Sequence, residues 1–234
     1  MKVEIWSDVM CPFCYIGKRK FELALEQFPQ KEQVEIIWKS FQLNPDMVTD
    51  PQKNINQYLS EAKGWSLQQS ADANNYVTEL AKKVGLNYNL DKAIVANSFD
   101  AHRLSHLAKK FNVQDALEER LFLAYFTEGK NTADHATLIT LGVEVGIPES
   151  EITTMLSGEE YAEEVNRDIY EAQMVGARGV PFFVFERKYA VSGAQDTTVF
   201  MNVLDTVYRE SLPEQKVMAT AVDTGEICTP EGCD

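Results

Sequence analysis

The sequence predicts an α/β fold in which a mixed domain is interrupted by a large all-helical insertion. Strand-like runs occur near the N-terminus and again in the last quarter of the chain, whereas the long stretch between them carries helical periodicity. A Cys-x-x-Cys motif, Cys11-Pro12-Phe13-Cys14, stands where the first strand-like run gives way to the first helix-like one. With 234 residues and 44% hydrophobic content, the chain is long and apolar enough to bury a sizeable core.

The beginning of the chain indicates a βαβ unit. Residues 2–7 alternate between apolar and polar side chains, which is typical of a strand. Residues 15–28 carry apolar side chains at helical spacing, and Pro29 ends this helix. Residues 33–41 form a second apolar run that is typical of a buried strand. Because a helix joins the two strands, we expect them to lie parallel in one sheet.

The middle of the chain, from residue 45 to about residue 158, is predicted to be helical. Ser66 is a suitable N-cap for a helix that ends near Gly85. Three further helices are indicated by apolar residues at helical spacing: Leu104, Leu107, Ala108 and Phe111; Leu117, Leu121, Ala124 and Tyr125; and Leu138, Leu141 and Val145. Gly129 and Gly146 follow the last two groups and favour helix ends there.

The last part of the folded chain predicts a helix, a hairpin and a final helix. Residues 159–175 are helical in pattern, and Gly176 ends that helix. A dense apolar strand follows at residues 178–185, and after a polar turn a second strand begins at Tyr189. Asp196 is placed to cap the final helix.

Charge and composition exclude several classes of function. The net charge of −14 leaves no basic stripe for the phosphates of a nucleic acid, and it equally disfavours an anionic membrane surface. No run approaches the roughly 18 apolar residues of a membrane-spanning helix. The N-terminus lacks the basic segment and apolar run of a signal peptide, so we expect a cytoplasmic protein. In that compartment cysteines are more often catalytic or metal-binding than structural.

The Cys-x-x-Cys motif combines the residue types that thiol–disulfide exchange requires. The unpaired N–H groups at a helix N-terminus stabilise a thiolate, which is the nucleophile in this chemistry. We therefore expect Cys11 to be the nucleophile, Cys14 to be the resolving thiol, and Phe13 to be an exposed contact for substrate. The pair could also be half of a metal site or two buried apolar residues, but the order strand, motif, helix favours redox chemistry.

Three separated segments carry a resemblance to a known family. They are residues 7–17 (Ser-Asp-Val-Met-Cys-Pro-Phe-Cys-Tyr-Ile-Gly), residues 97–103 (Asn-Ser-Phe-Asp-Ala-His-Arg) and residues 179–185 (Gly-Val-Pro-Phe-Phe-Val-Phe). In these segments the chain resembles the FrnE-like branch of the DsbA family, which is related to 2-hydroxychromene-2-carboxylate isomerases and kappa-class glutathione transferases. The resemblance covers about residues 1–210.

The order of the predicted elements, together with the resemblance, divides the chain into three parts. Residues 1–44 and 159–210 would form a discontinuous thioredoxin-like domain. Residues 45–158 would form the helical insertion that interrupts it. Residues 211–234 would remain as a C-terminal tail with a Cys-x4-Cys motif.

The resemblance also implies residues of a substrate site. Val180 and Pro181 would lie opposite the motif with a cis peptide bond between them, and the backbone before the proline would pair with a substrate segment. The same resemblance places Asn97, His102 and Arg103 in a cleft where they could contact substrate. His102 and His106 have a spacing that can ligate zinc, but no third ligand is evident, so we interpret them as polar residues of the insertion.

Two departures from the family pattern affect the expected chemistry. Thioredoxins and DsbA place a buried acid six residues before the first cysteine, and here that position is Ile5. Asp8 is the nearest carboxylate and is a candidate proton acceptor for the resolving thiol, although it could simply cap the helix. The Pro-Phe bridge lacks the histidine of DsbA, so we expect an intermediate redox potential, compatible with reductase or isomerase activity.

The tail holds a second cysteine pair, Cys228 and Cys233. The residues between them favour a turn. The pair could be two idle thiols, a second redox couple close enough to exchange with Cys11 and Cys14, or part of a metal site shared with them, and we favour the second interpretation.

The sequence therefore predicts a cytoplasmic thiol–disulfide oxidoreductase or isomerase. Its partners would be a protein or small molecule that carries a thiol or disulfide, and a cellular reductant such as glutathione or thioredoxin. We expect no cofactor, no metal and no nucleic-acid or membrane partner. The alternatives are a glutathione-dependent isomerase or transferase, and a redox-regulated chaperone or zinc-binding protein. Cysteines at both Cys11 and Cys14 weigh against a glutathione-dependent enzyme, whose relatives typically have serine at the first position.

Overall fold

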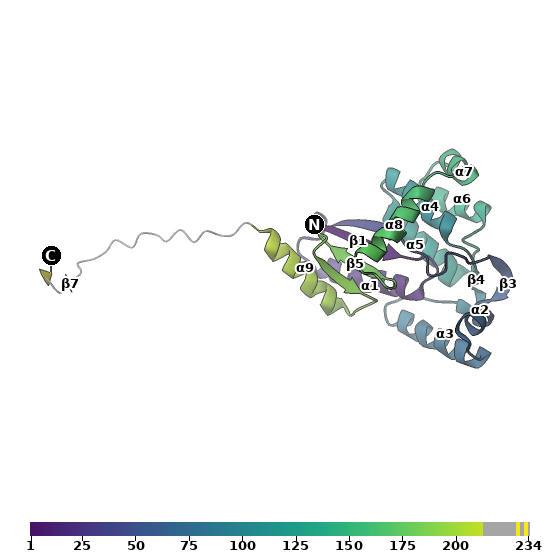
Figure 1. The fold of residues 1–234 in the computed structure, drawn as a ribbon, viewed down its shortest axis with the longest axis horizontal. Coiled ribbons are helices and arrows are strands. Elements are labelled where there is room, and N and C mark those ends of the chain that lie inside the picture. Colours follow the sequence, from purple (N-terminus) through teal and green to yellow (C-terminus); the bar gives the residue numbers. More distant parts are fainter. Residues whose placement is uncertain (213–227, 230–231, 234) are drawn as a thin grey trace.

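The computed structural model describes residues 1–212, 228–229 and 232–233. Its centre is a four-stranded mixed sheet in the order β2-β1-β5-β6 (Figure 1). β1 runs parallel to β2 and antiparallel to β5, and β5 pairs with β6 as a hairpin, which confirms the predicted βαβ unit and hairpin. The strands are β1 (Lys2–Ser7), β2 (Glu35–Ser40), β5 (Phe182–Phe185) and β6 (Tyr189–Ser192).

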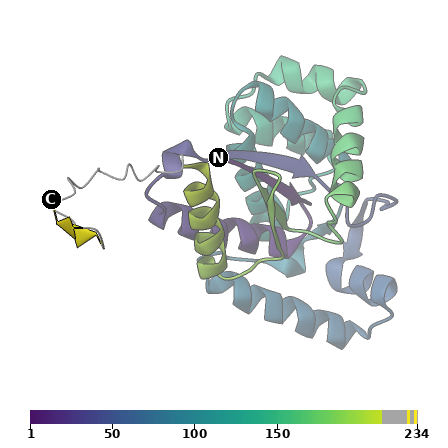
Figure 2. The ribbon, with the colours of Figure 1, turned by 60° about the vertical axis from the view of Figure 1, so that its left-hand side comes forward.

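Helices cover both faces of this sheet (Figure 2). Phe183 of β5 packs against Phe21 on the face of α1 and α9, with 5.6 Å between the ring centroids. Its neighbour Phe182 clusters instead with Trp6 on the face of α8. β5 is therefore buried at every position, as expected for a strand with helices on both sides. The helices are α1 (Pro12–Gln27), α8 (Ala162–Met174) and α9 (Thr197–Ser211).

The chain between β2 and α8 forms the predicted helical insertion. A short two-stranded sheet, β3 with β4, accompanies its helices. Neither this sheet nor α2 and α7 was indicated by the sequence, because β3 (Asp50-Pro-Gln-Lys-Asn) has no apolar alternation and α2 buries only Ile55. The elements are β3 (Asp50–Asn54), α2 (Ile55–Lys63), α3 (Leu67–Lys82), β4 (Ile94–Val95), α4 (Phe99–Lys110), α5 (Gln114–Leu123) with a π-helical turn at Ala124–Glu128, α6 (His135–Glu144) and α7 (Glu149–Ser157).

Two predicted helix caps have different outcomes. Ser66 caps α3 as expected, and its hydroxyl accepts a hydrogen bond from the backbone N–H of Gln69. Asp196 occupies the N-cap position of α9, but its carboxylate makes no capping bond and pairs with Lys20 of α1. The carboxylate thus joins two helices on one face of the sheet instead of satisfying its own helix end.

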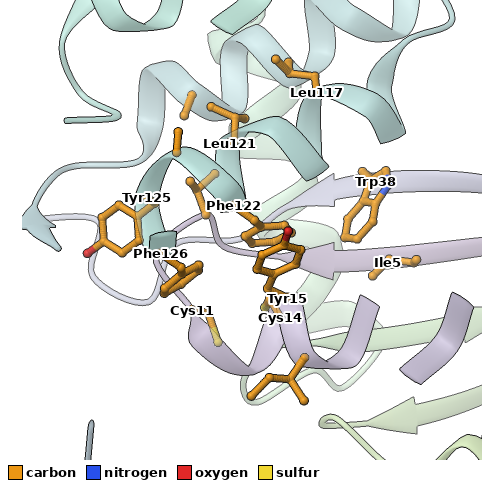
Figure 3. Packing of buried hydrophobic residues seen from close by; sticks show 14 of the residues in the cluster. Ile5, Cys11, Cys14, Tyr15, Trp38, Leu117, Leu121, Phe122, Tyr125 and Phe126 are labelled. Atoms are coloured by element: carbon orange, nitrogen blue, oxygen red, sulfur yellow. The ribbon is translucent and has the colours of Figure 1, made fainter. Parts of the chain in front are cut away.

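The insertion packs directly on the helix that carries the Cys-x-x-Cys motif (Figure 3). Tyr15, the residue after Cys14, stacks on Phe122 of α5 with 5.0 Å between the ring centroids. Phe126 lies beside Phe122 and also stacks on Tyr15, at 6.4 Å. Aromatic contacts of this kind add to the stabilisation from buried area, so the motif helix and the insertion share one core.

The tail contributes one described feature, a short antiparallel hairpin. Cys228 stands opposite Cys233 in the pairing of β7 (Cys228–Thr229) with β8 (Gly232–Cys233). The predicted proximity of the tail to Cys11 and Cys14 falls outside the described residues and stays a prediction. Within the described part of the chain, no helix has the length and apolar character that crossing a membrane requires.

Candidate active site

The two motif cysteines lie at the start of α1. Cys11 occupies the N-cap position and Pro12 begins the helix, as the sequence predicts. Both side chains are free thiols. Cys11 is 4% exposed and Cys14 is 1% exposed, so Cys11 is the more accessible of the two, although both are buried. Phe13 between them is 38% exposed, which agrees with the prediction of an outward-facing side chain.

The segment before β5 lies against the first cysteine. The Val180–Pro181 peptide bond is cis, as predicted. The Cys11 sulfur is 3.5 Å from the Val180 carbonyl oxygen, to which it donates a hydrogen bond. Gly17 leaves room for the proline, because a Cβ atom at this position would meet Pro181 Cγ at 2.9 Å. The structure therefore brings Cys11, Val180 and Pro181 together from distant parts of the chain.

The electrostatics of the site distinguish the two thiols. Burial raises the pKa of Cys14 well above its ordinary value, and the hydrogen bond with Cys11 and the charge of Cys11 act in the same direction. The Ser7 hydroxyl and the Asp8 backbone amide, both close to the Cys14 sulfur, act in the opposite direction. The thiol of Cys14 therefore holds its proton more tightly than an ordinary cysteine does.

Tyr88, a residue that the sequence did not single out, reaches the motif from the insertion. Its hydroxyl donates a hydrogen bond to the carbonyl oxygen of Pro12 at 2.7 Å. Burial raises the pKa of Tyr88 far above its ordinary value, and the charges of Cys11 and Cys14 raise it further. Tyr88 therefore remains a neutral donor that holds the first turn of α1.

An apolar cavity of about 370 Å³ opens beside the motif. It lies between the motif, the chain after β2, and α2. This cavity was not predictable from the sequence, because α2 was not indicated and the residues that line the cavity meet only in the tertiary fold. Apolar side chains that line the cavity include Met10, Pro12, Leu43, Ile55, Leu59 and Phe126.

The Asp8 carboxylate does not cap α1, which corrects one of the two interpretations of this residue. α1 has no side-chain cap, and Asp8 is fully buried. Its Oδ2 atom accepts a hydrogen bond of 2.8 Å from the backbone N–H of Leu43, and its Oδ1 atom lies 3.6 Å from Nε2 of His102. A role of Asp8 as proton acceptor for Cys14 stays a prediction.

The expectation that Arg103 faces the cleft is wrong. Its guanidinium is buried and donates hydrogen bonds to the backbone carbonyls of Met155, Gly158 and Glu160 and to the carboxylate of Asp100. These carbonyls lie at the end of α7 and in the segment that leads to α8. Arg103 therefore joins α4 to this segment, and the sequence spacing alone could not show that its partners are main-chain atoms.

His102 is buried, and Asn97 is half-buried with its amide bonded to groups of the protein itself. Asn97 accepts from Gln42 and donates to the backbone carbonyls of Pro45 and Met47, so it fixes the chain that follows β2. His102 is 2% exposed and faces Asp8. Both residues hold parts of the chain around the motif, and a contact of either side chain with substrate stays a prediction.

His106 does not form a zinc pair with His102. Its Nε2 atom lies 3.1 Å from a carboxylate oxygen of Asp168 and 3.2 Å from the Ser40 hydroxyl. Among the residues that the structure describes, no group of three or more histidine, cysteine, aspartate or glutamate side chains is arranged to hold a metal ion.

The chain matches one family model and is similar to several known proteins. The sequence model of the DSBA-like thioredoxin domain matches residues 2–205. The solved structure of the probable DsbA oxidoreductase SCO1869 from Streptomyces coelicolor is 36% identical, with a TM-score of 0.85, and the alignment covers 100% of this chain and 98% of that one. The uncharacterized protein YwbO of Bacillus subtilis (strain 168) is 28% identical over 85% of this chain and 92% of its own length. The cytosolic disulfide reductase DsbM from Pseudomonas aeruginosa shares the fold at 16% identity, with a TM-score of 0.65 over 90% of this chain and 100% of that one.

Proposed function

Since this chain belongs to the family of DSBA-like thioredoxin domains and is an enzyme of the disulfide oxidoreductase and isomerase class, we propose that Cys11 and Cys14 are its redox-active dithiol. The observation that carries the proposal is the position of the Cys11 sulfur. It lies at a helix N-terminus, 3.5 Å from the Val180 carbonyl beside a cis proline, with the buried thiol of Cys14 in the first turn of the helix. A nucleophile, a resolving thiol and a backbone acceptor for substrate are thus assembled at one place.

The proposed reaction is a two-step exchange. The Cys11 thiolate attacks a substrate disulfide, a bond forms between Cys11 and one substrate sulfur, and the other substrate sulfur leaves as a thiolate. Cys14 then gives up its proton and attacks the Cys11 sulfur, which releases the second substrate sulfur and closes the Cys11–Cys14 disulfide. The substrate gains two electrons that the enzyme loses. A cellular thiol reductant such as glutathione or thioredoxin restores the dithiol, and the same steps in reverse oxidise or rearrange a substrate.

We propose that substrate approaches over Phe13, Val180 and Pro181. Phe13 offers the exposed apolar surface next to the nucleophile, and the Val180 carbonyl can accept a backbone N–H of an extended substrate segment once the Cys11 thiol has reacted. The substrate would be a protein or small molecule with an accessible disulfide or thiol. We also place the enzyme in the cytoplasm, the compartment in which such reductants keep thiols reduced.

A single mass measurement tests the dithiol and the tail together. We propose that Cys228 and Cys233, which stand opposite each other in the β7–β8 hairpin, form a second redox couple. Each disulfide removes two hydrogen atoms, so the intact mass after mild oxidation should fall by two hydrogens for Cys11–Cys14 and by four if the tail pair also closes. Replacing Cys228 and Cys233 together by serine should leave the first loss and remove the second. No reversible mass loss at all would contradict the proposed function.

Gly17 provides a test of the contact between the motif helix and Pro181. Replacing Gly17 by alanine should lower kcat/KM for a disulfide substrate by about tenfold, because the new Cβ atom must displace the proline ring. The matched control is Gly179→Ala, two residues before Pro181, where a Cβ atom meets nothing within 4 Å. The measurement is kcat/KM of both variants, from initial rates of insulin reduction at several insulin concentrations. Equal rates for the two would show that the close approach of α1 to Pro181 does not matter for activity.

A further inference from the structure

Asp8 contacts both cysteines of the motif through its main chain. Its carbonyl oxygen accepts a hydrogen bond from the backbone N–H of Cys11 at 2.9 Å. Its backbone amide is close enough to the sulfur of Cys14 to lower the pKa of that thiol, against the larger effect of burial. The position of Asp8 therefore bears on both thiols, and whatever fixes its side chain also fixes the main chain around the dithiol.

The Asp8 side chain is fixed by two groups from outside the motif. Leu43 donates its backbone N–H to Oδ2 at 2.8 Å. His102 of α4 places Nε2 at 3.6 Å from Oδ1, and this nitrogen has no hydrogen-bond partner among the described residues. A buried polar atom that lacks a hydrogen bond costs free energy, unless an opposite charge nearby compensates for the loss. The Asp8 carboxylate is the charge that can do so for His102.

A second buried carboxylate lies near enough for its charge to raise the pKa of His102. Glu118 of α5 is 3% exposed, and it accepts a hydrogen bond of 2.6 Å from the Ser105 hydroxyl. The backbone carbonyl of Phe41, after β2, acts on the pKa of the imidazole in the same direction. His102 thus lies among a carboxylate from the motif loop, a carboxylate from α5 and a backbone carbonyl, all in the interior of the protein.

These surroundings favour an imidazolium. Burial by itself would lower the pKa of His102, but the nearby Asp8 carboxylate, the charge of Glu118 and the Phe41 carbonyl outweigh burial and raise it above its ordinary value. Burial raises the pKa of Glu118, although its bond from Ser105 and the charge of His102 oppose the change. A proton on His102 therefore balances a buried negative charge one side chain away from the dithiol.

We propose that His102 is a positioning residue of the redox centre, and that its imidazolium acts through Asp8 so that its proton and the redox state of Cys11 and Cys14 are coupled. The inference rests on the proposed function. When Cys11 thiolate and Cys14 thiol reduce a substrate disulfide, a negative charge leaves the site, the Cys14 proton departs with one product thiol, and the other product leaves as a thiolate. The imidazolium then has less negative charge near it. By thermodynamic reciprocity, a proton on His102 must in turn favour the reduced dithiol.

The first experiment needs no substitution, because the chain has only three histidines. The imidazole resonances of the full chain are followed by NMR against pH in the reduced and the oxidised protein. The pKa of His102 should be higher in the reduced protein by on the order of 0.5, the effect of one thiolate charge through a partly polar interior. His106, held by Asp168, and His135, exposed beside Asp100, are internal controls whose titration curves should coincide in the two states. Coincident curves for His102 as well would overturn the inference.

The second experiment measures the coupling from the other side. The equilibrium of the dithiol with glutathione is determined for His102→Gln and for His106→Gln, after circular dichroism shows that each variant is folded. His102→Gln should shift the equilibrium constant about threefold toward the disulfide, because a pKa difference of about 0.5 corresponds to a factor of about three. His106→Gln should not change the equilibrium constant. Equal constants for His102→Gln and the unsubstituted protein would also overturn the inference. If His102→Gln does not fold, the NMR titration alone decides.

The outcomes also separate this inference from the proposed function. If Cys11 and Cys14 do not form a reversible disulfide, the proposed function fails before either experiment begins. If the disulfide forms but the pKa of His102 is the same in both redox states, the proposed function still holds and only the coupling is refuted.

Discussion

Replacing Cys11 by serine is expected to reduce thiol–disulfide exchange by about a thousandfold or more, because a serine hydroxyl does not supply the thiolate that attacks a disulfide. Cys14 cannot take over the role, since it is the more deeply buried thiol and burial raises its pKa. The measurement is the initial rate of insulin reduction in the presence of a thiol reductant. Full activity of Cys11→Ser would show that the nucleophile has been assigned to the wrong residue.

The companion variant, Cys14→Ser, should behave differently. Cys11 still attacks substrate, but nothing resolves the mixed disulfide, so an adduct accumulates. Intact mass spectrometry after incubation with a small disulfide should show one substrate half bound per chain, and reductant should remove it. The double variant, with serine at both Cys11 and Cys14, should show no adduct at this site.

Replacing Arg103 by methionine is expected to destabilise the protein by about 3–5 kcal/mol. Methionine keeps much of the side-chain volume, but it leaves the carbonyls of Met155 and Gly158 and the carboxylate of Asp100 without their buried donor. The free energy of unfolding from urea titrations measures the effect. The exposed Arg167 of α8 is a matched control, because its 3.9 Å pair with Glu164 lies at the surface and Arg167→Met should cost less than about 0.5 kcal/mol. Equal costs for the two substitutions would contradict the structural role of Arg103.

Much of the fold could be predicted because its signals are local. The parallel pairing of β1 with β2 follows from two apolar runs joined by a helix, and the caps and glycines of the insertion mark several helix ends. β3 escaped prediction because its strand character comes only from pairing with β4, in an irregular register and without apolar alternation. Strands of this kind are specified by their partner and not by their own side chains.

The candidate site, like the fold, could be predicted only in part. The proposed roles of Cys11 and Cys14 come from a contiguous motif, and the cis bond before Pro181 was expected from the family resemblance. The roles of Asp8, His102 and Arg103 were not identifiable, because each depends on a partner far away in the chain. A polar residue on a predicted helix gives no indication of whether it meets substrate, a carboxylate or a backbone carbonyl. Only the packing of α4 against the motif loop decides this.

The position of β1 between β2 and β5 has a consequence for how the protein is made. β2 leaves the ribosome soon after β1, so the parallel pair can form early, but β5 is synthesised only after the whole insertion. Until then the other edge of β1 lacks its partner, and an unpaired apolar edge invites association with other chains. The nascent chain also carries Cys11 before the Val180 carbonyl exists to meet it. The thiol site is therefore completed only after the whole insertion has been synthesised, and delays within the insertion should favour aggregation over activity.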